Sequence, residues 1–132
     1  MSLSTDPIAD MIARIRNSLM VRKSQINLPH SRLKEAIARL LKDNKYIAGV
    51  SVSDATIGKT LTLQLFEEGQ AATITSITRT STPGRRNYAS VDEIPTVKRG
   101  RGMVILSTSK GLMTGTEAKA KRVGGEIICE VY

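Results

Sequence analysis

The chain has 132 residues, a net charge of +8 and a pI near 10.0, and 40% of its residues are hydrophobic. This length allows one compact domain or two small lobes but not a large enzyme, and the hydrophobic content argues against a wholly disordered chain. No apolar run approaches the length of a membrane span, and the N-terminal segment lacks the apolar stretch of a signal peptide. We therefore expect a soluble, cytoplasmic protein with a polyanionic partner, either nucleic acid or an acidic membrane surface.

Helical periodicity marks the start of the chain. Thr5 or Asp6 can serve as the N-cap, Pro7 suits the first helical turn, and apolar residues recur on one face as far as Leu19. Residues 24–29 then form a short extended segment, and Ser31 is placed to cap a second helix. In that helix we expect an apolar inward face and a basic solvent face. The inward residues are Leu33, Ile37, Leu40 and Leu41, and the solvent residues are Lys34, Arg39 and Lys42.

Two strands are predicted next, at residues 46–52 and 59–66, on either side of a turn-like segment, and in the second strand apolar and polar residues alternate. The acidic segment that follows them reads as a connection between lobes. We therefore predict an α+β fold of two lobes. Residues 1–66 form an α/β lobe (helix, strand, helix, hairpin), residues 67–72 connect, and residues 73–132 form a mainly β lobe with one short helix.

The second lobe combines strand patterns with strong turn and cap signals. Thr114 and Glu117 form a capping box, and Ile127, Cys129 and Val131 are expected on one face of the last strand. The expected elements are a strand at 72–80, a turn at 83–84, a basic loop at 98–102, a strand at 103–108, a helix at 114–123 and a strand at 126–132.

Positive charge is concentrated in the second lobe. From Arg79 to Arg122 there are ten lysines or arginines against three acidic residues. A surface that serves only solubility interleaves charges of both signs more evenly. This clustering favours nucleic acid as the partner.

The enzyme-like patterns in the sequence are weak. Ser107 and Lys110 match S-x-x-K, but the serine ends a predicted strand and the partner motifs of those hydrolases are absent. Gly58-Lys59-Thr60 lacks the first glycine of a phosphate-binding loop. Cys129 reads as a small core residue and His30 has no evident partner, so neither a metal nor another cofactor is expected.

The segment Ser107-Thr108-Ser109-Lys110-Gly111 instead suits a surface that binds a nucleic-acid backbone. Short hydroxylated side chains beside a glycine allow hydroxyl and amide groups to reach phosphates and sugar 2′-hydroxyls, which is how the RNA minor groove is recognised. The scarcity of aromatic residues, 3% of the chain, argues against stacking on single strands. No helix carries a cluster of base-reading side chains, so structured RNA is favoured over duplex DNA.

Three separated segments resemble the bacterial small-subunit ribosomal protein S8 family. They are "TDPIADMIARIRNS" near the N-terminus, "STPGRRNY" at 81–88, and "STSKGLMTGTEAKAKRVGGEIICEVY" at 107–132. The order and spacing of these segments agree over the whole chain. The resemblance implies a primary rRNA-binding protein that binds an irregular helix in the central domain of the small-subunit rRNA. It also implies a role in platform assembly beside neighbouring ribosomal proteins, and for some members a second RNA partner, their own mRNA.

The resemblance also assigns the RNA contacts, most of them to the second lobe. The segment 107–111 would enter the minor groove, with Gly124, Gly125 and Glu126 beside it. Further contacts are implied at Arg85, Arg86, Tyr88, Thr5, Asp6 and Asn17.

Two positions depart from the family pattern. Thr82 stands where a basic residue is usual, and the segment 98–102 is more basic than usual, so Lys98, Arg99 and Arg101 are candidate phosphate contacts. Two alternatives remain open. A free regulatory RNA-binding protein would bind a hairpin without sedimenting with ribosomal subunits, and a small serine hydrolase would acylate at Ser107.

Overall fold

The computed structural model describes residues 6–54 and 58–132 as an α+β protein, which confirms the predicted fold class. Residue contacts divide it into two units, described separately here. The first unit spans residues 10–75, and the second comprises residues 76–132 with the start of the first helix up to Ala9. The lobe boundaries expected from the sequence stay a prediction.

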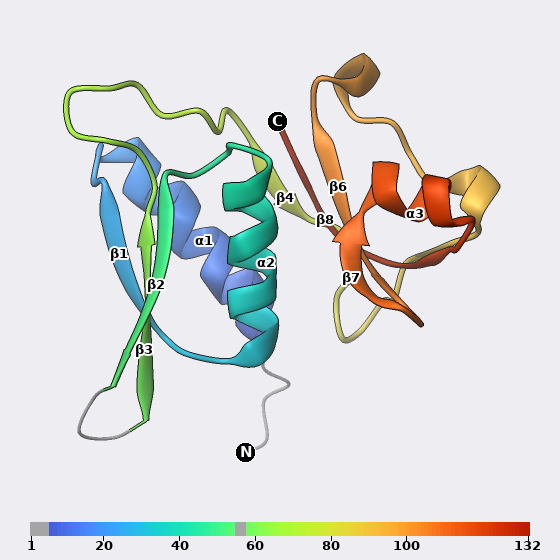
Figure 1. The fold of residues 1–132 in the computed structure, drawn as a ribbon, viewed down its shortest axis with the longest axis horizontal. Coiled ribbons are helices and arrows are strands. Elements are labelled where there is room, and N and C mark those ends of the chain that lie inside the picture. Colours follow the sequence, from blue (N-terminus) through green and yellow to red (C-terminus); the bar gives the residue numbers. More distant parts are fainter. Residues whose placement is uncertain (1–5, 55–57) are drawn as a thin grey trace. The chain divides into compact units, whose positions relative to one another are not determined.

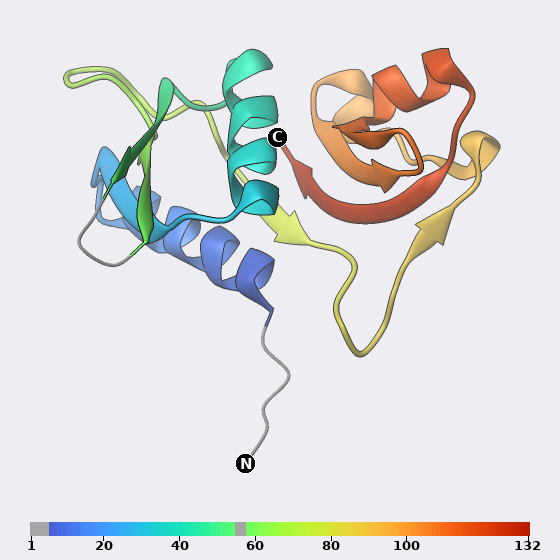
Figure 2. The same cartoon turned by 60° about the horizontal axis from the view of Figure 1, so that its bottom comes forward.

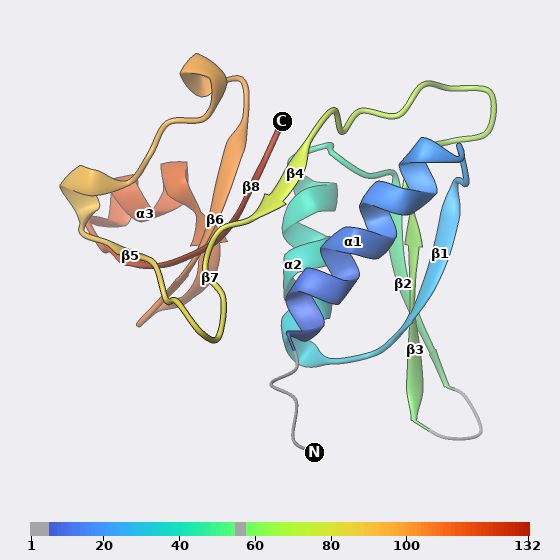
Figure 3. The same ribbon diagram turned by 180° about the vertical axis from the view of Figure 1, so that it is seen from behind.

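The first unit packs two helices on a three-stranded antiparallel sheet (Figure 1). Its strand order is β1-β3-β2, and α1 and α2 lie side by side, with α2 nearer the viewer in Figure 1 and α1 nearer in Figure 3. The central strand buries Leu61 and Leu63 completely, whereas Thr62 between them is only half-buried. The elements are α1 (Pro7–Met20), β1 (Gln25–Pro29), α2 (Arg32–Asp43), β2 (Gly49–Asp54) and β3 (Lys59–Gln64).

The predicted orientation of α2 was partly wrong. Ser31 caps the helix as expected, because its Oγ accepts a hydrogen bond from the Lys34 amide at 3.1 Å. However, Lys34 is buried and Leu33 is 43% exposed. The Lys34 ammonium donates to the Pro29 carbonyl at 3.0 Å, so its aliphatic stem lies in the core while its charge is satisfied at the edge. His30 also has a partner, since its Nε2 lies 2.7 Å from Glu35 Oε1.

The second unit is a five-stranded antiparallel sheet with one short helix. The strands follow the order β4-β8-β6-β7, and β5 pairs with the start of β8. Helix α3 covers one side, and Figure 2 shows β8 curving on the other side of the core. The elements are β4 (Ile77–Arg79), β5 (Tyr88–Ala89), β6 (Met103–Thr108), β7 (Gly111–Thr114), α3 (Gly115–Lys121) and β8 (Gly125–Val131).

Three expectations in the second unit needed correction. The strand predicted at 72–80 is confined to β4, where pairing with β8 begins at Ser76 and Tyr132 through two reciprocal backbone hydrogen bonds. No strand was predicted at residues 111–114, where the structure has β7 paired with β6. Ile127 does not share a face with Cys129 and Val131, because a register shift between Ile105 and Leu106 leaves Ile128 as an extra residue in β8.

The core of the second unit follows from this shift. Ile127 pairs with Leu106 and packs with Val104, Met113 and Ala118, whereas Cys129 pairs with Ile105 on the other face. Burial raises the pKa of the Cys129 thiol to about 12, so this residue is a core side chain as expected. In the part of the chain that the structure describes, no helix has the length and apolar character needed to span a membrane.

Candidate nucleic-acid interface

The segment 107–111 forms the end of a β-hairpin rather than an open loop. Thr108 pairs with Gly111, which leaves Ser109 and Lys110 as a two-residue turn. The Thr108 hydroxyl donates to the Gly111 carbonyl at 2.8 Å and accepts from the Lys110 amide at 3.1 Å. Gly111 has φ +107°, a conformation that favours glycine. The turn is thus held by its own hydrogen bonds, and it exposes Ser109 and Lys110.

The two glycines at 124 and 125 lie beside this hairpin because of close backbone packing. Gly125 pairs with Thr108, and a Cβ at this position would overlap the Ser107 carbonyl oxygen. At Gly124, a Cβ would overlap the Ala89 carbonyl oxygen. Only glycine therefore allows the end of β6, the start of β8 and β5 to come together. The sequence-predicted segments 107–111 and 124–126 form one continuous surface.

Glu126 connects this surface to the arginine-rich turn at 81–88. It pairs with Ser107 on one side and with Tyr88 on the other. Its Oε2 accepts hydrogen bonds from the Ser81 hydroxyl at 2.5 Å and from Arg86 Nη1 at 2.9 Å. Ser81 is fully buried and also accepts a hydrogen bond from the Asn87 amide, so it holds the turn at 81–88 against the start of β8.

The electrostatics of Glu126 favour its ionised form. Burial by itself would raise the pKa of this carboxyl, but the hydrogen bonds from Ser81 and Arg86 and the charges of Arg86 and Arg79 outweigh it. The net result is a pKa below the ordinary glutamate value. The ionised Glu126 holds Arg86 in place, while Tyr88 beside it is 69% exposed.

Asp6 has a structural partner. Its carboxylate caps α1 by accepting from the Ala9 amide at 3.2 Å, and it forms an ion pair with Arg79 at 3.1 Å. Arg79 also donates to the Ile128 carbonyl at 2.8 Å, so this arginine ties the start of α1 to β8. Neither Arg79 nor Ser81 was singled out from the sequence as a contact, because their partners are far away along the chain.

Three further residues, Arg85, Asn17 and Thr5, are predicted as RNA contacts from the sequence. Arg85 is exposed in the turn that the Thr82–Arg85 bridge closes. Asn17 is exposed on α1 in the first unit, and Thr5 lies outside the described residues. Each of these positions stays a predicted RNA contact.

The basic loop lies at the opposite end of β6 from the hairpin turn. Lys98 and Arg99 both have positive φ values, 49° and 54°, and the Lys98 ammonium lies 4.5 Å from the centre of the Tyr132 ring. The Gly102 amide donates to the Val97 carbonyl at 3.0 Å, which closes the loop. The structure thus separates Lys98, Arg99 and Arg101 from Ser109 and Lys110 by the length of β6.

The geometry gives no support to the enzyme-like patterns. Ser107 faces Leu112 across the hairpin, whereas Lys110 is in the turn, so the two are not brought onto one helical face. Lys59 begins strand β3 rather than a helix. Among the described residues, no group of three histidine, cysteine or acidic side chains could hold a metal ion.

Comparison with known proteins agrees with the arrangement of these segments. The family model described as ribosomal protein S8 matches residues 6–132. The chain is 45% identical over 132 residues, all of both chains, to small ribosomal subunit protein uS8 of Ruthia magnifica. It is 48% identical over 128 residues to the protein of that name from Teredinibacter turnerae, which covers 96% of this chain and 97% of the relative. The chain therefore belongs to the ribosomal protein S8 family.

Proposed function

We propose that the chain is a non-catalytic, rRNA-binding constituent of the small ribosomal subunit. The relatives named above are small-subunit ribosomal proteins, which agrees with this role and with the cytoplasmic location expected from the sequence. Its RNA would be an irregular helix in the central domain of the small-subunit rRNA. Binding there would help to assemble the platform beside neighbouring ribosomal proteins. Its own mRNA is a further candidate partner.

The observation that carries this proposal is the hairpin turn at Ser109 and Lys110. The Thr108 hydroxyl forms its hydrogen bonds within the turn, whereas the Ser109 hydroxyl makes no hydrogen bond within the described residues. A rigid, exposed turn with a hydroxyl, an ammonium and backbone groups suits the sugar edges and phosphates of a minor groove. Arg86 and Tyr88 border the same surface through Glu126.

A Ser109→Ala variant tests the proposal. We expect it to lose about 1–3 kcal/mol of binding free energy for the central-domain rRNA hairpin, because a polar group of the RNA would be left unpaired. The matched control is Ser51→Ala, which removes an exposed hydroxyl from β2 in the first unit. Equal affinities of the two variants and the unmodified protein, measured by filter binding, would show that the turn is outside the interface.

Two experiments separate this role from its alternatives. Co-sedimentation of the protein with small ribosomal subunits is expected, and a free regulatory RNA-binding protein would bind the hairpin without co-sedimenting. An activated ester is expected to leave Ser107 unmodified, as judged by mass spectrometry. A covalent Ser107 adduct would favour the hydrolase instead.

A further inference from the structure

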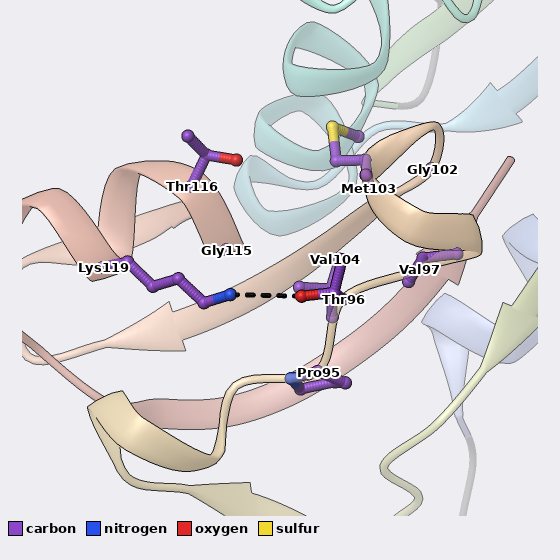
Figure 4. Close-up of a pocket in the computed structure, with 10 residues that line it drawn as sticks. Pro95, Thr96, Val97, Gly102, Met103, Val104, Gly115, Thr116 and Lys119 are labelled. Carbon is purple, nitrogen blue, oxygen red and sulfur yellow. Dashed lines mark hydrogen bonds between the residues drawn. The ribbon is translucent and has the colours of Figure 1, made fainter.

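A small polar cavity lies at the end of β6 that is remote from the hairpin turn. Its volume is about 70 Å³, and Figure 4 shows its walls. They come from the start of β6, the start of α3 and the loop that precedes β6. The lining residues used below are Thr96, Gly100, Gly102, Thr116 and Lys119.

The polar side chains of this cavity, those of Thr96, Thr116 and Lys119, are hydrogen-bond donors or can act as donors. Lys119 extends from α3 across the cavity, and its Nζ lies 3.4 Å from the Thr96 hydroxyl (Figure 4). Thr116 adds a second hydroxyl, whereas the amides of Gly100 and Gly102 already donate to the Val97 carbonyl and are not free for an anion. No carboxylate is among the residues that line the cavity. This composition suits an anion with several oxygen acceptors.

The surrounding charge has the same sign. Lys98, Arg99 and Arg101 belong to the loop that forms one wall, and all three residues are exposed. Backbone hydrogen bonds from Gly100 and Gly102 to the Val97 carbonyl, each 3.0 Å long, fix the shape of that loop. The loop is therefore a preformed basic rim beside the Lys119 ammonium.

We propose that this cavity binds a single phosphate group of an RNA backbone. The proposal rests on the proposed function and adds a second contact to it. The cavity, of about 70 Å³, is small, which suits one phosphate group. Strand β6 has six residues, so at about 3.3 Å per residue the cavity and the hairpin turn lie about 20 Å apart. The two contacts therefore belong to different positions along the bound RNA.

The first experiment titrates inorganic phosphate into the full-length, RNA-free protein and follows amide resonances by NMR. We expect shifts concentrated at Thr96, Gly100, Gly102 and Thr116, and their loss in Lys119→Gln. The matched control, Lys121→Gln, removes the same charge from the same helix without touching the cavity. Shifts spread equally over the basic surface, or unchanged by Lys119→Gln, would overturn the proposal.

The second experiment asks whether the phosphate is that of RNA. Affinity for a central-domain rRNA fragment is measured at several salt concentrations for Lys119→Gln, Lys121→Gln and Ser109→Ala. We expect Lys119→Gln to weaken binding about three- to tenfold and to reduce the salt slope by about 0.7–0.9, the loss of one phosphate contact. Lys121→Gln should change affinity less than about twofold. Equal effects of the two lysine variants would show that the cavity takes no RNA phosphate.

The three variants distinguish the two proposals. A loss with Ser109→Ala but equal effects of the two lysine variants would leave the hairpin contact standing and remove the cavity contact. A specific loss with Lys119→Gln and none with Ser109→Ala would leave the cavity contact and remove the hairpin contact. Thermal unfolding of each variant checks that lost affinity does not come from lost structure.

Discussion

Gly125 shows how a single residue shapes the proposed RNA-binding surface. Its missing side chain allows β8 to lie against the backbone of Ser107 and Thr108, where a Cβ would overlap main-chain atoms. Backbone atoms cannot move aside as the end of a flexible side chain can. Close packing of the backbone, and not a positive φ, therefore restricts this position to glycine, because the φ of Gly125 lies outside the positive range.

Gly125→Ala should lower the free energy of unfolding by about 1–3 kcal/mol, the usual cost of forcing extra volume into a packed site. Gly84→Ala is the matched control, because a Cβ at Gly84 would meet no atom within 4 Å and its φ is not positive. That variant should remain within about 0.5 kcal/mol of the unmodified protein. Urea unfolding measures both values, and equal stability of the two variants would contradict the steric reading.

Glu126 makes part of the stability dependent on pH. Its pKa is lowered in the folded protein, so its contribution is fully present above the unfolded pKa of about 4.3 and is lost as the pH falls through the folded pKa. Glu126→Gln should therefore destabilise the protein most at neutral pH, and the difference should shrink toward acid pH. Urea unfolding of both proteins across this range checks the trend. A difference that stays constant with pH would mean that the charge of Glu126 contributes nothing.

At the scale of elements, the β6–β7 hairpin is held at its turn by one side chain. The Thr108 hydroxyl makes two hydrogen bonds across the turn, and the Thr108 residue pairs with Gly125 on the neighbouring strand. The sequence repeats hydroxylated residues at 107, 108 and 109, but the structure gives them different environments. Thr108 supports the turn, whereas Ser109 is exposed at its tip.

Thr108→Val keeps the shape of the side chain and removes its hydroxyl. We expect a loss of about 1 kcal/mol in the free energy of unfolding, because the two hydrogen bonds of the turn disappear. We also expect weaker RNA binding, since the tip loses its fixed shape. The control is Thr60→Val on β3, where the hydroxyl makes no hydrogen bond within the described residues. Unchanged stability of Thr108→Val in thermal unfolding would contradict this role.

Local patterns in the sequence predicted most of these elements. The caps at Ser31 and Thr114, the alternation in β3 and the apolar run of β6 depend on neighbouring residues, so they can be recognised without the fold. The phase of α2 could not be settled in this way. Lys34 is buried only because the Pro29 carbonyl is within reach of its ammonium, and that position depends on how β1 meets the helix.

Pairing between distant segments explains what the sequence did not reveal. The bulge at Ile128 and the short strands β5 and β7 exist because of their partners in the sheet, which periodicity alone does not indicate. The same holds for the candidate site. Hydroxyls and glycines near residues 107–111 could be recognised from the sequence, but Ser81 and Arg86 became neighbours of Glu126 only through the fold.

At the scale of the whole molecule, the positive net charge raises the affinity for RNA and also makes that affinity depend on salt. A net charge of +8 attracts any polyanion, and such attraction weakens steeply as salt is added. The arrangement of the hairpin turn and the Glu126 cluster adds a fixed geometry that charge alone does not provide. Recognition of an irregular RNA helix should therefore survive conditions that abolish nonspecific binding.

The most direct test compares two RNAs at two salt concentrations. The first is the central-domain rRNA hairpin with its irregular helix, and the second is a fully paired duplex of equal length. We predict a clear preference for the hairpin that persists at the higher salt concentration, because hydroxyl and backbone contacts depend on RNA shape. Equal binding to both RNAs, lost together as salt rises, would contradict shape-specific recognition and would leave only the attraction of a basic protein for RNA.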